Sequence, residues 1–178
     1  MMNSLNLLLF VVLSALAVVA SLHAWRNQQV YGFFRFLAFE TLALLIVWNI
    51  SCWFRDPFSI QQIISWTILA ISTVLAAHGF YLLKTVGKAQ ARIMENTRRL
   101  VEVGAYRYIR HPLYASLILF GWGVFFKGAD LLSIALVSMA TVLWFLSARY
   151  EERFNIDRFG EEYSQYMERT KMFIPFLL

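Results

Sequence analysis

LVEVGAYRYIRHPLY, residues 100–114, joins a charged segment to an apolar one, and the rest of the chain is organised around it. Pro112 lacks a backbone N–H and disfavours helical geometry at His111, so the sequence predicts a helix that begins at Pro112. The free N–H groups of that first turn, with Arg110 beside them, predict an anion site. Aromatic faces and hydroxyl groups come from Tyr106, Tyr108 and Tyr114.

A simpler interpretation of this stretch is membrane anchoring. Arg107 and Arg110 would then be juxtamembrane positive charges, and the tyrosines an interfacial belt. The compact order GxYxxxRHPxY favours a binding site over this interpretation.

Composition indicates an integral membrane protein, since 60% of the 178 residues are hydrophobic and the mean hydropathy is +0.58. We predict an all-α fold with five transmembrane helices, the last two forming a C-terminal helical hairpin, followed by cytosolic amphipathic tail helices. The fourth apolar run is short, reaching only about 21 Å against a hydrocarbon core of about 30 Å, so it should tilt or sit in thinned bilayer. The five runs are Leu5–Trp25, Phe36–Phe54, Ile60–Leu83, Leu113–Phe126 and Leu131–Ala148.

Basic residues predict the orientation. Fourteen of the sixteen Lys and Arg residues fall in the predicted loops 26–35 and 84–111 and in the tail 149–178. This bias predicts a cytoplasmic tail and an outside N-terminus, with the basic loops facing anionic lipid. No nucleic-acid-binding pattern accompanies these charges. The single cysteine, Cys52, provides neither a disulfide framework nor a thiolate metal cluster, and no metal is predicted.

Most isolated polar residues have ordinary interpretations. Glu40, near the start of the second run, and His78, near the end of the third, are expected to be interfacial. Gly160 should stop a helix, and Glu161 and Glu162 suit the first turn of the next one. An aromatic stripe is expected to lie on the membrane surface, and comprises Phe154, Phe159, Tyr163 and Tyr166.

Glu151 and Glu152 differ, because they stand where the last span leaves the bilayer. Two adjacent carboxylates at that depth are costly unless they are paired or bound to something. Their available positive partners are Arg107, Arg110 and His111.

The stretch at residues 100–114, followed by YEERFNIDRFGEEYSQYMERT and a closing Ile-Pro, resembles the isoprenylcysteine carboxyl methyltransferase family and the related membrane phospholipid and thiol methyltransferases. The resemblance covers about residues 87–175. It implies a membrane methyltransferase with a three-helix anchor at residues 1–83 and a cofactor-binding core at 84–178. It also implies that S-adenosyl-L-methionine binds on the cytosolic side.

The resemblance assigns a role to particular residues. It implies that Leu100, Val101, Tyr106, His111, Pro112, Leu113 and Tyr114 border the cofactor, and that Glu151 is its acidic ligand. Arg98 stands where many relatives have histidine, and Gln90 matches a cofactor-binding glutamine if a one-residue gap is allowed. The chemistry of a charged methyl donor makes Arg110, His111 and Glu151 the predicted catalytic residues.

One departure from the family bears on the acceptor. Carboxyl methyltransferases of this family have an arginine four residues before the acidic ligand, where this chain has Ser147. Arg149 is nearest, but two residues on a helix amount to about 200° around the axis. We therefore expect prenylcysteine to be a poor methyl acceptor for this protein. The preferred acceptor should be a neutral, amine- or thiol-bearing molecule that is lipophilic or small.

Two other function classes remain open at this point. Membrane sterol reductases that use NADPH also have an RHPxY motif, although they typically have a polar residue where this chain has Leu113. A non-catalytic membrane scaffold with an inherited pocket is the third class. Comparing the binding of S-adenosylmethionine with that of NADPH would distinguish a methyltransferase, a reductase and a non-catalytic scaffold.

Overall fold

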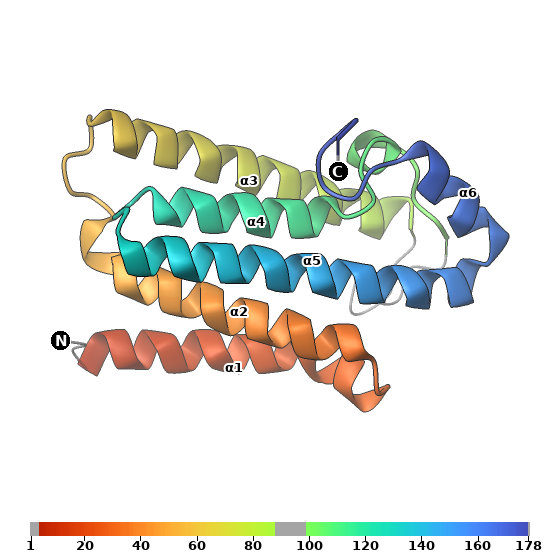
Figure 1. Cartoon of the computed structure of the whole chain (residues 1–178), viewed down its shortest axis with the longest axis horizontal. Coiled ribbons are helices and arrows are strands. Elements are labelled where there is room, and N and C mark those ends of the chain that lie inside the picture. Colours follow the sequence, from red (N-terminus) through yellow and green to blue (C-terminus); the bar gives the residue numbers. More distant parts are fainter. Residues whose placement is uncertain (1–3, 88–98, 178) are drawn as a thin grey trace. The chain divides into compact units, whose positions relative to one another are not determined.

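The computed structural model describes residues 4–87 and 99–177, which form helices joined by short loops (Figure 1). One isolated parallel bridge, between Ile109 and Lys171, is present in this part of the chain. The helices are α1 (Ser4–Arg26), α2 (Val30–Asn49), η1 (Ile50–Cys52), α3 (Ile60–Thr85), η2 (Gly104–Arg107), α4 (Pro112–Phe125), α5 (Leu131–Phe159) and α6 (Glu161–Arg169).

Within these described residues, four helices are long and apolar enough to cross a membrane. They are α1, α2 extended through η1, α3 and α5. The predicted class, an all-helical membrane protein, is confirmed. Helix α4 has 14 residues, or about 21 Å, so the count of five spans remains a prediction.

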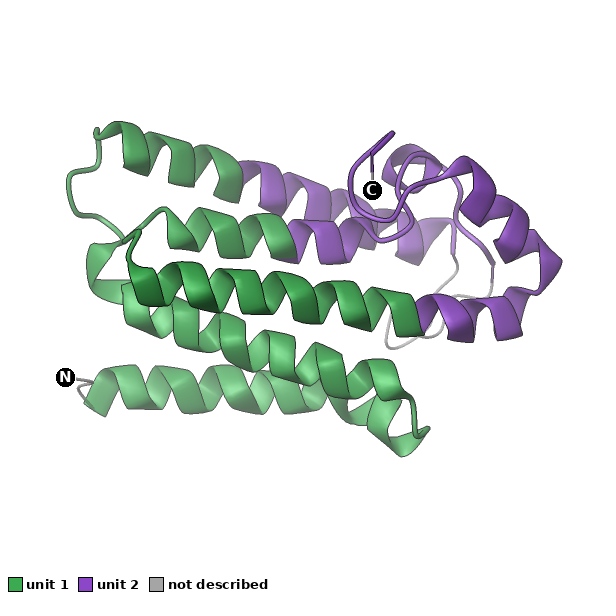
Figure 2. Ribbon diagram, in the orientation of Figure 1, with its two compact units in different colours: residues 1–69, 118–150 green, residues 70–117, 151–178 purple. Residues whose placement is uncertain are grey.

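The chain forms two compact units (Figure 2). Unit 1 comprises Met1–Leu69 and Ile118–Tyr150, and unit 2 comprises Ala70–Leu117 and Glu151–Leu178. The boundary falls inside α3, α4 and α5, so each unit is built from segments distant in sequence.

At one end of unit 1, the predicted loop 26–35 is wrong. Gln28 has a φ of 55°, and the chain reverses within three residues, so α2 begins at Val30 rather than near Phe36. Arg35 is therefore helical and 2% exposed, and its Nη2 donates to the Ala20 carbonyl at 2.8 Å. A turn of three residues is enough because its amides bond back to the end of α1.

Glu40 was also misplaced by the predicted helix start. It lies near the middle of the 20-residue α2, and its Oε2 accepts a hydrogen bond from the Ser14 hydroxyl of α1 at 2.7 Å. A polar pair of this kind joins two helices where lipid offers no partner.

At the other end of unit 1, polar side chains tie the helix ends together. Lys127 is 3% exposed; its Nζ donates to Gln62 Oε1 at 2.9 Å and lies 3.4 Å from the Trp66 ring centroid. Gly123 allows a close approach of α3 to α4, since a Cβ there would lie 2.8 Å from the Leu69 side chain.

Unit 2 contains the end of α3, the loop before α4 and the tail. Gly104 has a φ of 59° and lies against His78, leaving no room for a Cβ. His78 Nε2 accepts a hydrogen bond from the Ala105 amide at 3.3 Å. Pro112 begins α4 as predicted.

The tail is folded more tightly than predicted. Helix α5 continues beyond the apolar run to Phe159, and Gly160, with φ 60°, precedes α6. Tyr163 and Tyr166 are 3% and 2% exposed, so this part of the stripe lies inside unit 2 and not on a membrane surface. The stripe turned inward because Tyr166 donates to the Tyr106 carbonyl at 2.6 Å.

Candidate functional site

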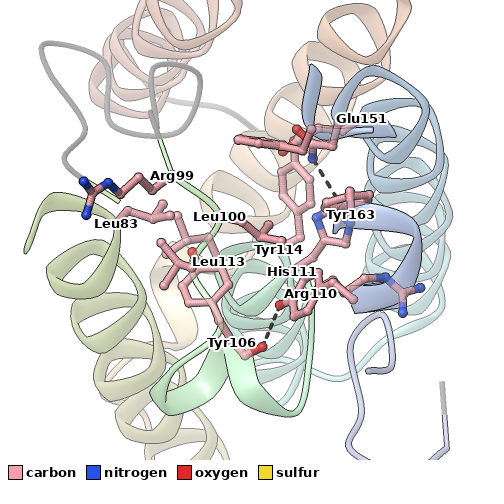
Figure 3. A pocket seen from close by; sticks show the side chains of 14 residues that line it. Leu83, Arg99, Leu100, Tyr106, Arg110, His111, Leu113, Tyr114, Glu151 and Tyr163 are labelled. Atoms are coloured by element: carbon pink, nitrogen blue, oxygen red, sulfur yellow. Dashed lines mark hydrogen bonds between the residues drawn. The ribbon is translucent and has the colours of Figure 1, made fainter. Parts of the chain in front are cut away.

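Unit 2 contains a pocket with about 610 Å³ of empty space, including its open mouth (Figure 3). Three parts of the unit line it, namely the end of α3, the loop and first turn of α4, and the last part of α5 with α6. The lining residues are Leu83, Arg99, Leu100, Val101, Tyr106, Arg110, His111, Leu113, Tyr114, Glu151, Asn155, Phe159, Tyr163 and Tyr166.

The loop before α4 is fixed by backbone pairing with the tail. The amides of Arg110 and His111 donate to the carbonyls of Lys171 and Met172 at 2.8 and 3.1 Å. The Lys171 amide donates in turn to the Tyr108 carbonyl at 3.1 Å. Since the His111 amide is occupied, it is no longer part of the predicted anion site.

Arg110 is enclosed by protein acceptors. Its Nε donates to Glu152 Oε1 at 2.6 Å, and its Nη1 donates to the carbonyls of Met167 and Thr170. The side chains of Arg110 and Glu152 are 9% and 3% exposed. Arg110 thus fastens α5 and the end of α6 to the loop.

His111 lies beside the same carboxylate. Its Nε2 is 3.4 Å from Glu152 Oε1, and this buried nitrogen has no well-aligned hydrogen bond among the described residues. The ring stacks on Tyr114 at 5.6 Å between centroids. Arg110 and His111 are therefore the partners of Glu152, while the third predicted partner, Arg107, is exposed.

Glu151, the neighbouring carboxylate, faces the pocket. Its Oε2 accepts a hydrogen bond from the Tyr114 hydroxyl, and no ion pair is recorded for it within the described part of the chain. Asn155, one helical turn further along α5, also lines the pocket. The site therefore offers one half-buried carboxylate and one amide to a ligand.

Tyrosines form much of the wall. Tyr106, Tyr163 and Tyr166 are nearly buried, and burial raises the pKa of each phenol well above its usual value. These rings stay neutral at physiological pH. Neutral aromatic faces beside a carboxylate suit an organic cation.

Comparison with known proteins identifies the family. The model of the family described as phospholipid methyltransferase matches residues 60–162, more than half of the chain. The chain belongs to this family. The matched segment of this phospholipid methyltransferase family member includes every lining residue except Tyr163 and Tyr166.

Individual relatives agree with the resemblance to isoprenylcysteine and thiol methyltransferases. Methanethiol S-methyltransferase 1 of Bradyrhizobium diazoefficiens is 40% identical over 70 residues, covering 39% of this chain and 24% of the relative. Methanethiol S-methyltransferase of Crocosphaera subtropica is 27% identical over 158 residues, covering 80% and 60%. A probable protein-S-isoprenylcysteine O-methyltransferase of Oryza sativa subsp. indica is 29% identical over 123 residues, covering 63% of each. The chain thus spans less than two thirds of each of these relatives.

The structure brings most of the predicted site residues of this family member together. Pro112 is not one of the lining residues, and its ring is fully buried at the start of α4. Gln90 and Arg98 lie outside the described residues. The eight that line it are Leu100, Val101, Tyr106, Arg110, His111, Leu113, Tyr114 and Glu151.

Several lining residues were missed by the sequence analysis. Asn155 follows Glu151 by four positions, a spacing that places both on one helix face and was a usable signal. Tyr163 and Tyr166 were noticed but assigned to the membrane surface. Leu83 and Arg99 could not be singled out in the sequence, because each stands beside a residue of its own type.

Ser147, at the position of the family's substrate arginine, is fully buried in unit 1. Its hydroxyl donates to the Tyr31 carbonyl at 3.2 Å. Arg149 is exposed.

Proposed function

We propose that this chain is an integral membrane methyltransferase that binds S-adenosyl-L-methionine in the pocket of unit 2. Family membership supports this activity. The observation that carries the proposal is the pairing of a carboxylate, Glu151, with neutral tyrosine rings in one pocket. The sterol-reductase alternative is not favoured, because the relatives reported above are named as methyltransferases.

The residues present fit this cofactor. Glu151 can accept hydrogen bonds from ribose hydroxyls or from an ammonium group. His111 has a buried nitrogen that lacks a well-aligned partner in the described part of the protein, and a ligand would supply one. The rings of Tyr106 and Tyr114 would face the positive charge. Because Nε and Nη1 of Arg110 are engaged by Glu152 and two carbonyls, Arg99 is the other cation of the lining that could meet a ligand carboxylate.

S-adenosyl-L-methionine supplies a methyl group attached to a positively charged sulfur. Methyl transfer from this donor requires no nucleophile from the protein, which would act through positioning and desolvation. Leu83, Leu113 and Val101 would exclude water from the bound cofactor, while Glu151 and Asn155 would orient it.

Calorimetric titration in detergent tests the cofactor. The protein should bind S-adenosylmethionine, and NADPH should give no heat of binding. Glu151→Gln should weaken the affinity about tenfold to hundredfold, the effect of losing a charge-assisted contact of about 1.5–3 kcal/mol. Glu161→Gln is the matched control, because Glu161 is an exposed carboxylate on the first turn of α6. Binding of NADPH instead would refute the proposal.

For the acceptor, we propose a lipophilic or small molecule without a carboxylate, with a small thiol preferred. Ser147 cannot pair with a carboxylate, and it is enclosed in unit 1. Arg110 is held by Glu152 and two carbonyls. Two of the relatives above are named methanethiol S-methyltransferases, which supports the thiol.

Arg99 supports a second candidate, an isoprenylcysteine carboxylate. Arg99 is one of the lining residues, and a guanidinium is the kind of group that pairs with a carboxylate. Methylation assays with labelled donor should compare an alkyl thiol, a phospholipid amine and a farnesylated cysteine analogue. Efficient turnover of the farnesyl compound that Arg99→Gln abolishes would establish the second candidate.

The proposed topology has five spans, an outside N-terminus and a cytoplasmic pocket. The proposed division of the chain is a membrane anchor at 1–83 and a catalytic core at 84–178. The basic asymmetry of the sequence supports this orientation.

A further inference from the structure

The turn formed by Ile174, Pro175, Phe176 and Leu177 has an unusual residue at its third position. The Leu177 amide donates to the Ile174 carbonyl at 3.3 Å, and Phe176 has a φ of 68°. Proline at the second position and a positive φ at the third are features of a type II turn. That third position normally holds glycine, because a Cβ is strained there.

The strain at Phe176 is not offset by burial in the protein. Phe176 is 83% exposed, Leu177 78% and Ile174 49%. A strained aromatic residue at the tip of an exposed turn is doubly unfavourable in water. Such features persist where they serve a function, and exposed apolar clusters commonly mark a binding surface.

The turn lies beside the residues that lead into α4. The Tyr108 ring packs edge-on against Phe176 at 6.3 Å, and Tyr108 is itself 48% exposed. The backbone bridge between Ile109 and Lys171 holds the two segments together. Because the apolar helix α4 begins at Pro112, a few residues further on, the turn lies near the depth at which the chain enters the bilayer.

Two basic residues flank this apolar tip. Arg107 and Lys171 are exposed, and neither has a carboxylate within ion-pair distance among the described residues. The Arg107 guanidinium lies 5.9 Å from the Tyr108 ring centroid. An apolar tip with flanking positive charges is complementary to the headgroup layer of an anionic bilayer leaflet.

We infer that this turn inserts Phe176 and Leu177 into the interfacial layer of an anionic leaflet, while Arg107 and Lys171 contact lipid phosphates. The insertion also connects the pocket to the lipid surface. Arg110 binds the Thr170 carbonyl, and the Phe173 ring lies 6.1 Å from His111, so the short segment between α6 and the turn is also part of the pocket's surroundings. The inference does not depend on the reaction that the pocket performs.

Spin-label accessibility in nanodiscs tests the insertion. The full chain with Cys52→Ser would carry a nitroxide at Leu177→Cys or, as a matched control, at Gln165→Cys, an exposed polar position on α6. In an equal mixture of phosphatidylcholine and phosphatidylglycerol, the label at position 177 should show a several-fold higher ratio of oxygen to nickel-chelate accessibility than the control. Equal ratios at the two positions would overturn the inference. A label shielded from both reagents would indicate a protein partner or second copy, and would also overturn it.

Two further variants separate lipid insertion from a structural role. Phe176→Gly removes the backbone strain and the apolar tip together, so the accessibility ratio at position 177 should fall several-fold while the melting temperature stays constant or rises. A lower melting temperature would show that Phe176 belongs to the folded core, against the inference. Arg107→Gln combined with Lys171→Gln should reduce the difference between anionic and pure phosphatidylcholine nanodiscs. Equal insertion of the unmodified turn in both lipids would refute the charge contribution.

Discussion

Neutralising Glu151 and neutralising Glu152 should have different effects, although the two carboxylates are adjacent in the sequence. Glu152→Gln removes the charge that faces Arg110 at 2.6 Å, in a place where Glu152 is 3% exposed. Glu151→Gln changes a half-buried carboxylate that accepts a hydrogen bond from Tyr114. We expect the first variant to lose stability and the second to lose cofactor affinity.

The magnitudes follow from the two environments. Breaking a buried ion pair from one side costs about 3–5 kcal/mol. Arg110 keeps two carbonyl acceptors, and a glutamine oxygen can still accept one hydrogen bond, so about 2–3 kcal/mol is expected. For a chain of this size, that lowers the melting temperature by roughly 5–10 °C. Glu151→Gln should cost less than about 1 kcal/mol of stability, since the amide oxygen can replace the acceptor for Tyr114.

Tryptophan fluorescence during heating in detergent measures stability, and calorimetric titration of S-adenosylmethionine measures affinity. Glu161→Gln serves as the control in both assays, and both readings should match those of the unmodified protein. Equal melting temperatures for Glu151→Gln and Glu152→Gln would refute the assignment of Glu152 as the buried partner of Arg110. Unchanged affinity in Glu151→Gln would refute the assignment of Glu151 to the ligand.

Three other predictions use separate measurements. His111→Ala should weaken S-adenosylmethionine binding about tenfold or more in the same titration while the protein stays folded, because it removes a buried ring from the pocket. Cysteine introduced at Asp56 or Gln165, in a chain with Cys52→Ser, should react with an impermeant reagent from opposite sides of sealed vesicles, and labelling from one side would contradict the topology. Hydrogen bonds from the Ser133 amide and Trp48 lower the pKa of Asp130, so the stability that this carboxylate adds is present above the ordinary carboxyl pKa of about 4 and lost as the pH falls further. The melting temperature of Asp130→Asn should therefore be lower than that of the unmodified protein at neutral pH and equal to it in strong acid.

The sequence by itself determined the helical class and many of the boundaries. Apolar runs long enough to span a bilayer leave the backbone few alternatives to helix, because lipid cannot satisfy its hydrogen bonds. Pro112 begins α4 and Gly160 separates α5 from α6 for equally local reasons, since each restricts or permits backbone angles at its own position. The stretch at residues 100–114 also contains half of the residues that line the pocket.

Tertiary structure decided which partner each polar group has. Glu151 and Glu152 are adjacent, so they differ by about 100° around a helix, and sequence alone could not say which one faces Arg110 and which faces the pocket. The inward position of Tyr163 and Tyr166 likewise depends on the Tyr106 carbonyl, which is distant in the chain. Arg35 became a buried helical residue because the Ala20 carbonyl was within reach of its guanidinium. Periodicity describes one helix at a time, whereas these choices depend on which segments of the folded chain meet.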